Sequence, residues 1–403
     1  MENLSVETWD FIRGHCRENV YELALQADKY PLVSMREAIV QIAGWQMAEK
    51  KIPLWANTPD IRYPQHLSME QCSSEMTACY KATLVSGDTL TDLTGGLGVD
   101  CSFFARNFIT VDYVEQQEQL CKLAVHNFSC LGLEQIRVHH SDGVAYLERM
   151  DPVDWLYLDP ARRDRKGGKV VLISDCEPDV SKLESLLVEK GSRVMVKLSP
   201  MLDMVSVLQM LKTIYEVHII AVNNECKEML VLLKKQLSSA GNEGFEPMIH
   251  CEQIVHNSVN QHFSFTLSEE KNAVTSMADA VGRYLYEPGA ALMKGGPYKL
   301  LCERYGVKKL HANSHLYTSD SPVDFPGRSF RVEAVSVFGK KELKNFLFGI
   351  EKANLTVRNF PSTVEALRKK LKLKEGGNVY LFATTLCSGE KVLIKCAKRD
   401  GVL

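Results

Sequence analysis

Short apolar segments alternate with amphipathic ones from about residue 88 to residue 236, and this alternation constrains the fold more than any other feature. Such alternation builds a parallel sheet covered by helices on both faces. Helical segments are predicted between the first five strands, at 98–108, 117–131, 143–150 and 179–191. The predicted strands are 89–93, 108–115, 136–142, 153–159, 193–199, 217–222 and 228–235.

The last two of these strands limit the fold further. They are separated only by residues 223–227, NNECK, which are too few to contain a crossover helix. Parallel neighbours need a crossover of about a dozen residues or more, so the two strands must pair antiparallel. The sequence therefore predicts an α/β fold with a seven-stranded, mostly parallel sheet that ends in an antiparallel strand.

The segments before and after the α/β region have different sequence patterns. Residues 1–85 carry apolar side chains at helical spacing, and 68–85 is predicted to be one helix capped by Ser68. Residues 290–306 read as an interrupted helix, and 329–403 as an α+β module that ends in a hairpin turning at Ser388-Gly389. The predicted domains are 1–85, helical; 86–240, the α/β domain; 241–327, a linker and small domain; and 328–403, a basic domain.

The composition suggests a reducing compartment. The 403 residues include 12 cysteines without a Cys-x-x-Cys pair, which predicts reduced and mostly buried thiols. The opening MENLSVETWDFIR has acids and no apolar signal-peptide core, and no run of about 18 apolar residues indicates a membrane span. We therefore expect a cytoplasmic protein with no membrane contact.

Charge is unevenly distributed along the chain. Residues 328–403 hold 16 Lys and Arg against 7 Asp and Glu, a net +9, which leaves −11 on the residues before them. A basic terminal module on an acidic body indicates a polyanionic partner, usually nucleic acid. A lysine-rich solvated surface explains the same count equally well, because charge alone says nothing about fold or chemistry.

The turn LTDLTGGLGVD joins the first predicted strand to a helix. Gly95, Gly96 and Gly98 can let a ligand approach the backbone there. The pattern is Gly-Gly-x-Gly rather than the Gly-x-Gly-x-x-Gly of dinucleotide enzymes, and Asp92 stands just before it. An acid suits a positively charged ligand such as a sulfonium or an ammonium better than a diphosphate. S-adenosylmethionine carries both cations, with a ribose and an adenine.

Three further acids end predicted strands. Glu115 ends the second, 17 residues after Gly98, where a carboxylate can accept two hydrogen bonds from a ribose diol. Asp142, followed by Gly143, ends the third and can contact an adenine edge, and Asp159 ends the fourth. Ligands of open parallel sheets bind beyond the carboxyl ends of the strands, so all four signals fall at the expected edge.

These residues carry a resemblance to a known family. DLTGGLGVD, Glu115, SDG and LDPARR resemble the motifs of the Rossmann-like class I S-adenosylmethionine-dependent methyltransferases. The whole chain is similar to a bacterial group with LSMEQCSSEMTACYK, DPARR, KLSPMLD, EPGAAL and KKLHANSHLYTS. The resemblance implies S-adenosylmethionine as cofactor and ferredoxin-like and THUMP-like C-terminal modules. It also implies RNA, with tRNA first, as the partner of the basic module.

The resemblance also implies roles for single residues. In methyltransferases acting on exocyclic amines the fourth motif is Asp/Asn-Pro-Pro-aromatic; here Asp159 and Pro160 match, but Ala161 and Arg162 replace the second proline and the ring. Asp159 is expected to orient a nucleophilic N–H and accept its proton. The expected catalytic residues are Asp159, Pro160 and Arg162. The expected substrate contacts are Arg162, Arg163, Lys197 and Ser199. The expected cofactor contacts are Asp92, Thr94, Gly95, Gly96, Gly98, Asp100, Glu115, Asp142, Gly143 and Asp159.

The sequence leaves alternatives open for the roles of several residues and for the function. Arg162 and Arg163 can bind a phosphate or stack on a base, or they can simply pair with nearby acids. A metal is not expected, because His311 and His315 have a metal-like spacing without a third ligand. The leading function is methylation of RNA at a base nitrogen. The others are a cofactor-binding, RNA-associated protein without turnover, and a methyltransferase of a small molecule or a protein.

Overall fold

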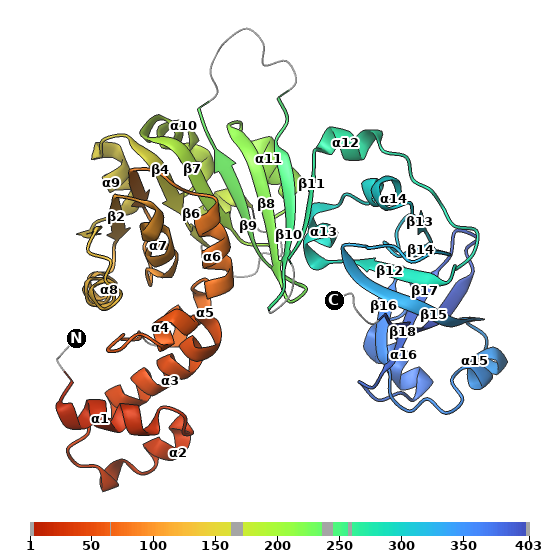
Figure 1. Cartoon of the computed structure of the whole chain (residues 1–403), viewed down its shortest axis with the longest axis horizontal. Coiled ribbons are helices and arrows are strands. Elements are labelled where there is room, and N and C mark those ends of the chain that lie inside the picture. The colour runs from red at the N-terminus through yellow and green to blue at the C-terminus, as the bar shows by residue number, and fades with distance from the viewer. Residues whose placement is uncertain (1–3, 65, 163–171, 236–244, 257–259, 400–403) are drawn as a thin grey trace. The chain divides into compact units, whose positions relative to one another are not determined.

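The structure is a computed structural model that describes residues 4–64, 66–162, 172–235, 245–256 and 260–399 (Figure 1). The described residues of Met1–Tyr215 and Met229–Asn242 form one compact unit, and those of Glu216–Glu228 and Glu243–Leu403 form a second. Within these ranges, no helix has both the length and the hydrophobicity of a membrane span.

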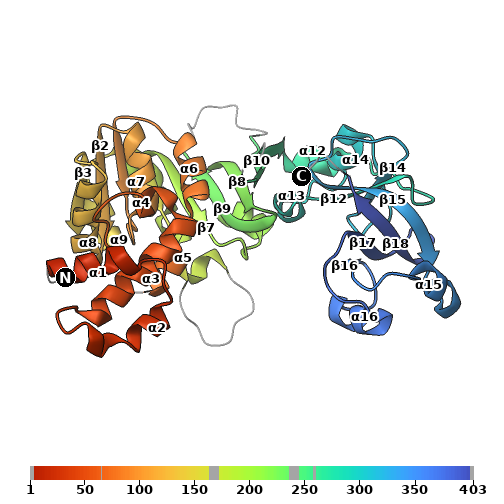
Figure 2. The ribbon, with the colours of Figure 1, turned by 60° about the horizontal axis from the view of Figure 1, so that its bottom comes forward.

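The N-terminal segment is helical, as predicted, with α1 and α2 packed along α3 (Figure 2). The expected single helix capped by Ser68 is wrong. Ser74 Oγ accepts the amide hydrogen of Thr77 at 3.3 Å, so a new helix begins there and the chain between the two helices is irregular. The elements are α1 (Val6–His15), α2 (Val20–Ala24), η1 (Ala27–Lys29), α3 (Met35–Lys51), α4 (Pro53–Ala56), α5 (His66–Gln71) and α6 (Glu75–Thr83).

The central sheet has the predicted parallel core. The strands are β1 (Thr89–Asp92), β2 (Thr110–Glu115), β3 (Ile136–His140), β4 (Val153–Leu158), β7 (Gly191–Leu198), β8 (Ile214–Val222), β9 (Glu225–Leu233), β10 (Met248–Ile254) and β11 (Gln261–Phe265). In the described residues their order is β11-β10-β8-β9-β7-β4-β1-β2-β3. The first five strands pair in parallel, and β9 runs antiparallel to β7. Each of the seven predicted strands is present, and the predicted antiparallel orientation of the last of them, β9, is confirmed.

Two features of this sheet were not predicted. Only Asn223 and Asn224 join β8 to β9, and both have positive φ, the conformation of a tight two-residue hairpin turn. Two more strands extend the sheet, because β10 pairs in parallel with β8 and β11 pairs antiparallel with β10. The sheet therefore has nine strands in the described residues rather than seven.

Helices connect the parallel strands. In Figure 1, α6, α7 and α8 lie on one face of the sheet, and α9 and α10 lie on the other. The helix α11 was not predicted, and a short ladder of β5 and β6 follows the fourth strand. The elements are α7 (Val99–Phe104), η2 (Ala105–Asn107), α8 (Glu118–Cys130), α9 (Gly143–Arg149), β5 (Ala161–Arg162), η3 (Ile173–Asp175), β6 (Cys176–Glu177), α10 (Val180–Lys190) and α11 (Met204–Met210).

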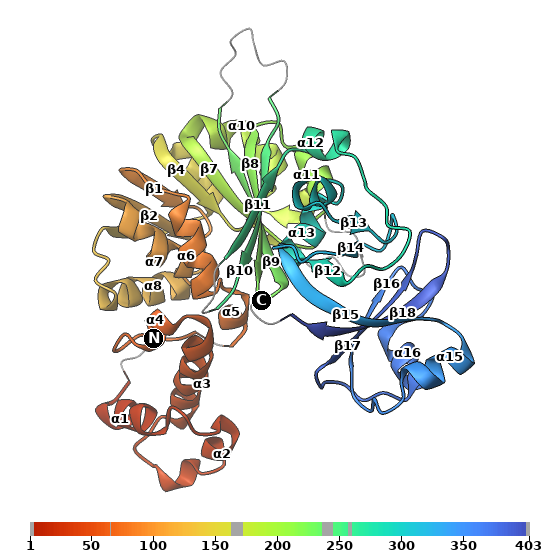
Figure 3. The same ribbon diagram turned by 45° about the vertical axis from the view of Figure 1, so that its right-hand side comes forward.

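The remaining residues build a second sheet. Its order in the described residues is β13-β14-β12-β15-β18-β17-β16. Figure 3 shows α15 and α16 beside β15–β18 on one side of this sheet. The interrupted helix, the α+β alternation and the final hairpin follow the prediction. The elements are α12 (Leu267–Asn272), β12 (Tyr284–Pro288), α13 (Ala290–Gly295), α14 (Leu300–Tyr305), β13 (Lys308–Lys309), β14 (Tyr317–Ser319), β15 (Gly327–Val337), α15 (Lys340–Phe346), β16 (Asn354–Arg358), α16 (Val364–Leu371), β17 (Val379–Thr385) and β18 (Lys391–Lys398).

The packing of α3 predicts that replacing one of its glycines by alanine lowers stability, which is the opposite of what helix propensity predicts. Alanine normally stabilises a helix relative to glycine by about 1 kcal/mol. A Cβ at Gly44, however, would lie 2.2 Å from Cβ of Tyr63, whereas a Cβ at Gly14 of α1 meets nothing within 4 Å. We expect Gly44→Ala to destabilise the protein by about 1–3 kcal/mol through this overlap. Gly14→Ala should leave the melting temperature unchanged or higher, and equal melting temperatures for both variants would contradict the packing of α3.

Candidate functional site

Functional side chains meet at the carboxyl ends of the parallel strands. Asp92 is the last residue of β1, Glu115 is the last of β2, and Asp159 directly follows β4. The neighbouring strand β7 brings Lys197 to the same edge, one residue before its end. Parallel pairing in the order β7-β4-β1-β2 therefore places the three predicted acids and a lysine along one rim.

Glu115 is held in place by the glycine turn. Its Oε2 accepts the amide hydrogen of Gly96 at 2.9 Å, and its Oε1 accepts that of Gln117 at 2.8 Å. A carboxylate has about four lone-pair sites, so each oxygen can accept one more hydrogen bond. The carboxylate is buried but has a fixed orientation and unused acceptor capacity. This arrangement suits recognition of two neighbouring hydroxyl groups.

The three glycines of the turn have different tasks. A Cβ at Gly95 would lie 2.3 Å from the ring of Tyr113, and one at Gly98 would lie 2.7 Å from that of Phe128. Both glycines are thus required by internal packing, and Gly98 also has φ +81°. Only at Gly96, with φ +57°, does the added Cβ meet nothing closer than 3.7 Å. Gly96 is therefore the glycine of this turn that leaves room beside the backbone.

The strand-to-helix turn also positions Asp159. Thr94 Oγ1 accepts the amide hydrogen of Asp159 at 2.6 Å and so ties the turn after β1 to the residue after β4. The side chain of Asp159 is 38% exposed and forms an ion pair with Lys197. Pro160 is buried. The backbone of Arg162 pairs with Cys176 in the β5–β6 ladder, and Arg163 lies outside the described residues.

Asp100, on the first turn of α7, is the centre of a buried polar cluster. Its carboxylate accepts hydrogen bonds from Ser73 Oγ at 2.8 Å and Tyr157 Oη at 2.6 Å. Lys81 Nζ lies 3.2 Å from Oδ1, and Lys197 Nζ lies 3.8 Å from Oδ2. Burial opposes ionisation, but Lys81 and Lys197, together with the hydrogen bonds from Tyr157 and Ser73, outweigh it and lower the pKa of Asp100 to about 2. Asp100 is therefore an anion held by two cations.

Lys197 joins this cluster to the rim. Its ammonium group contacts both Asp159 and Asp100, and it donates a hydrogen bond to Ser73 Oγ at 3.2 Å. The side chain is only 12% exposed. A lysine at a strand end is usually solvated, whereas this one is buried between two carboxylates. The position of the Asp159 carboxylate thus depends on Lys197.

Asp92 is buried in the site and is 1% exposed. Its Oδ1 accepts the amide hydrogen of Thr94 at 3.0 Å. Burial, and then repulsion from Asp100, Asp159 and Glu115, raise the pKa of Asp92 well above its usual range. Negative charge is therefore in excess around Asp92, and a positively charged ligand would relieve it.

The remaining predicted residues, Asp142, Gly143 and Ser199, lie at the same edge and make local contacts. Asp142 does not end β3, which stops at His140; it caps α9 and accepts the amide hydrogen of Ala145 at 2.9 Å. A Cβ at Gly143 would lie 2.2 Å from the carbonyl oxygen of Leu93, so this glycine lets α9 approach the turn after β1. Ser199, directly after β7, accepts the amide hydrogen of Met201 at 3.3 Å through its hydroxyl.

Sequence reasoning missed two members of the site. Ser73 lies in the break between α5 and α6, which the expected continuous helix concealed. Tyr157 of β4 was given no role in the sequence analysis, but its hydroxyl donates a hydrogen bond to Asp100. A usable signal for Ser73 was the sequence Cys72-Ser73-Ser74-Glu75, because a serine followed by an acid is typical of a helix start.

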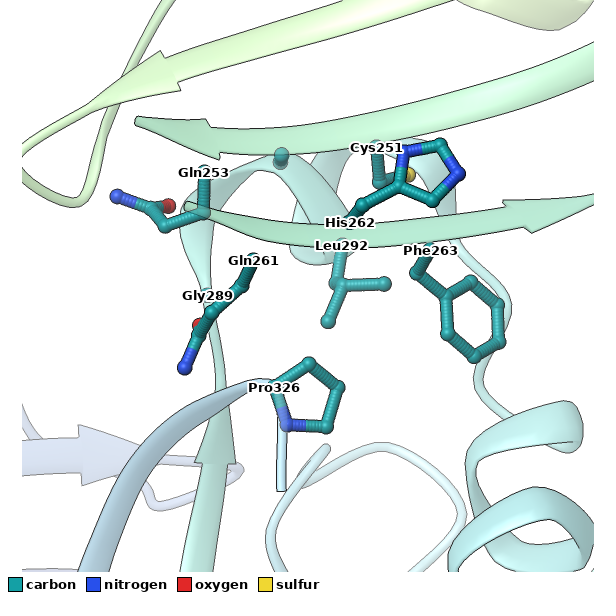
Figure 4. Close-up of a pocket in the computed structure, with 9 residues that line it drawn as sticks. Cys251, Gln253, Gln261, His262, Phe263, Gly289, Leu292 and Pro326 are labelled. Carbon is teal, nitrogen blue, oxygen red and sulfur yellow. The ribbon is translucent and has the colours of Figure 1, made fainter. Parts of the chain in front are cut away.

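A small cavity in the second unit does not belong to this site. It measures about 10 Å³ and is lined by residues of β10, β11 and α13 (Figure 4). That volume holds about one water molecule. Its lining contains none of the rim residues.

Comparison with known proteins identifies the C-terminal modules. Residues 284–326 match the model of a ferredoxin-like domain, and residues 327–398 match that of a THUMP-like domain. No curated protein matches the chain.

Solved structures resemble the chain to very different extents. A candidate methyltransferase from Porphyromonas gingivalis W83 is 33% identical, with 98% of each chain covered and a TM-score of 0.87. An rRNA methylase from Streptococcus thermophilus is 16% identical over 40% of this chain and 96% of its own, with a TM-score of 0.31. Because the first similarity spans nearly all of both chains, the protein belongs to the class I methyltransferases that carry a ferredoxin-like and a THUMP-like domain after the methyltransferase domain.

Proposed function

We propose that this methyltransferase uses S-adenosylmethionine to methylate RNA, most specifically tRNA, at a base nitrogen. The observation that supports S-adenosylmethionine as the cofactor is the fixed position of the Glu115 carboxylate. Its two oxygens are oriented by the amides of Gly96 and Gln117 beside the one glycine of the turn with free space. A ribose diol needs two acceptors with fixed orientation, and these oxygens provide them.

The charges of the rim fit the rest of this cofactor. Asp92 has a raised pKa because burial and three neighbouring carboxylates disfavour its ionised form. A sulfonium and an ammonium group nearby would make its ionisation easier, whereas a diphosphate would oppose it. Asp142, exposed at the start of α9, is the residue we assign to the adenine edge.

The main contribution of the protein to the reaction is to align the substrate with the methyl group of the cofactor. S-adenosylmethionine supplies an electrophilic methyl group whose leaving thioether is neutral. We assign to Asp159 the tasks of holding a substrate N–H and taking its proton; Thr94 fixes its backbone and Lys197 its carboxylate, which supports this assignment. Lys197 can shift toward Asp100 when substrate engages Asp159, because it contacts both carboxylates.

The basic module supports an RNA substrate. Exposed lysines cluster at the end of α16, at Lys369, Lys370, Lys372 and Lys374. A group of exposed cations neutralises phosphates and makes affinity depend on salt. We assign this surface to docking of the RNA backbone.

Replacing Glu115 tests the cofactor. Glu115→Ala removes both acceptors for the ribose diol, and hydrogen bonds to a charged group are worth about 1.5–3 kcal/mol each. We expect S-adenosylmethionine affinity, measured by calorimetry, to fall by at least about 100-fold. Glu118→Ala changes an exposed acid paired with Lys122 and should bind as the parent does. A parent protein that binds no S-adenosylmethionine, or a Glu115→Ala variant of parental affinity, contradicts the assignment.

Replacing Asp159 tests the proton acceptor. Asp159→Asn keeps the shape but accepts a proton poorly, so we expect methyl transfer to RNA to fall by about 10²–10⁴-fold. The measurement uses labelled cofactor and total RNA from cells that lack this protein. Asp151→Asn, at an exposed position before β4, is the control and should keep full activity. Parental activity of Asp159→Asn would remove Asp159 from the mechanism.

Lys372 offers a test that separates stability from RNA docking. It occupies the left-handed C-cap of α16 with φ +57°, a position that normally takes glycine. We expect Lys372→Gly to stabilise the protein by about 1 kcal/mol, because the strain of a side chain there is removed. The same change should weaken RNA binding and reduce the salt slope of the affinity by about 1.

The control for this variant removes one exposed lysine elsewhere. Lys50→Ala, near the end of α3, should leave the salt slope unchanged. A Lys372→Gly variant that melts higher and binds RNA with parental affinity and slope would exclude Lys372 from the docking surface.

A further inference from the structure

Imidazole and carboxylate side chains gather on one face of three neighbouring strands in the second unit. His218 of β8 pairs in register with His250 of β10, which pairs with Ser264 of β11. Two residues further along, Glu252 pairs with His262. Successive side chains of a strand alternate between faces, so all five lie on the same face of the sheet.

The opposite face of these strands belongs to the apolar interior. Cys251 and Phe263 are buried there, and a Cβ at Gly295 of α13 would lie 2.6 Å from Cys251 Sγ. Figure 4 shows His262 on the other side of β11 from Gln261 and Phe263. The imidazole side chains therefore lie on the face of β10 and β11 opposite to Cys251 and Phe263, although His262 is also among the residues that line the small cavity.

The groups on this face contact one another closely. Glu252 is buried, with a side chain 9% exposed, and its carboxylate meets His262 Nδ1. Ser264 Oγ lies 2.6 Å from His262 Nε2 and 2.7 Å from His250 Nδ1. The ring of His250 stacks on that of His218 with centroids 4.5 Å apart. Buried carboxylates in proteins are generally paired with a cation or coordinate a metal.

We propose that His250, Glu252 and His262 form a binding site for a divalent transition-metal ion, for which Zn²⁺ is the natural probe. One ligand atom of each residue lies within 4.8 Å of those of the other two. Two imidazole nitrogens and one carboxylate are a donor set that Zn²⁺ prefers. The ion would enter between Glu252 and His262, and Ser264 would orient the imidazoles as an outer hydrogen-bond partner.

A second group, Glu216, His218 and His250, meets the same distance limit but is a poorer site. His250 belongs to both groups, so it cannot serve two separate ions through one nitrogen. The side chain of His218 is only 5% exposed, whereas that of His262 is 54% exposed. The group with His262 therefore has access to solvent, and a water molecule can complete its coordination.

Zinc binding by the full chain tests the site. The probe is Zn²⁺ alone, titrated in competition with a chromophoric chelator after exposed thiols such as Cys79 and Cys387 have been alkylated. We expect one ion per chain and an increase of the melting temperature with Zn²⁺ concentration. Glu252→Gln and His262→Ala should each lower the affinity by more than about tenfold and abolish the thermal shift.

Controls and a second variant keep this test decisive. His262 is more than half exposed, so His262→Ala is expected to fold even if the buried Glu252→Gln does not. His256→Ala replaces an exposed histidine outside the group and should keep parental affinity. Absence of binding by the parent chain, or parental affinity in His262→Ala, overturns the proposal. Equal losses in His256→Ala and His262→Ala would also overturn it, because they would indicate unspecific binding.

Discussion

The anion of Asp100 organises the whole site. Its carboxylate is buried, and a buried charge is tolerated only where cations and hydrogen-bond donors surround it. The donors come from distant parts of the chain: Ser73 from the break between α5 and α6, Lys81 from α6, Tyr157 from β4 and Lys197 from β7. The N-terminal helical segment is therefore part of the site, since it supplies one of the two ammonium groups that keep Asp100 ionised. Through Lys197 the same anion also fixes the position of Asp159.

The sequence predicted the parts of this site that depend on local order along the chain. Glu115 and Asp159 could be placed because each ends a strand of an alternating pattern, and parallel strands end at one edge. The Asp100 cluster could not be placed, because it includes contacts between side chains 27 to 124 residues apart, from Ser73 and Asp100 to Ser73 and Lys197, which no local pattern encodes. β10 was missed for a related reason. Its sequence MIHCEQI alternates apolar residues with His250 and Glu252, which is typical of a half-buried strand, but its place in the sheet is defined by its pairing with β8, which no local pattern encodes.

The sequence predicted the position of the glycine turn correctly, but it gave only part of the reason for the glycines. All three glycines were assigned to ligand approach, yet Gly95 and Gly98 are required by the rings of Tyr113 and Phe128. The same motif thus serves packing at two positions and leaves space at one, Gly96. A glycine pattern in a sequence consequently indicates a tight turn more directly than it indicates a ligand. The independent signal for a ligand is Glu115, whose Oε2 accepts a hydrogen bond from Gly96 of the turn.

The charge of the C-terminal module requires a similar correction. The count of +9 treats every cation as available, but Arg328 and Arg358 are both bound to the buried Glu287, each with a side chain 36% exposed. These arginines hold β12, β15 and β16 together, which is a task of the fold. Arg368 and the lysines of the last turn of α16 also stabilise the negative end of the helix dipole, so their presence has a structural explanation. Lys372 and Lys374 lie beyond that turn, and Lys372 adopts a strained backbone conformation that a glycine would relieve. A charge kept at a cost to the fold is a stronger sign of an anionic partner than the net charge of the module.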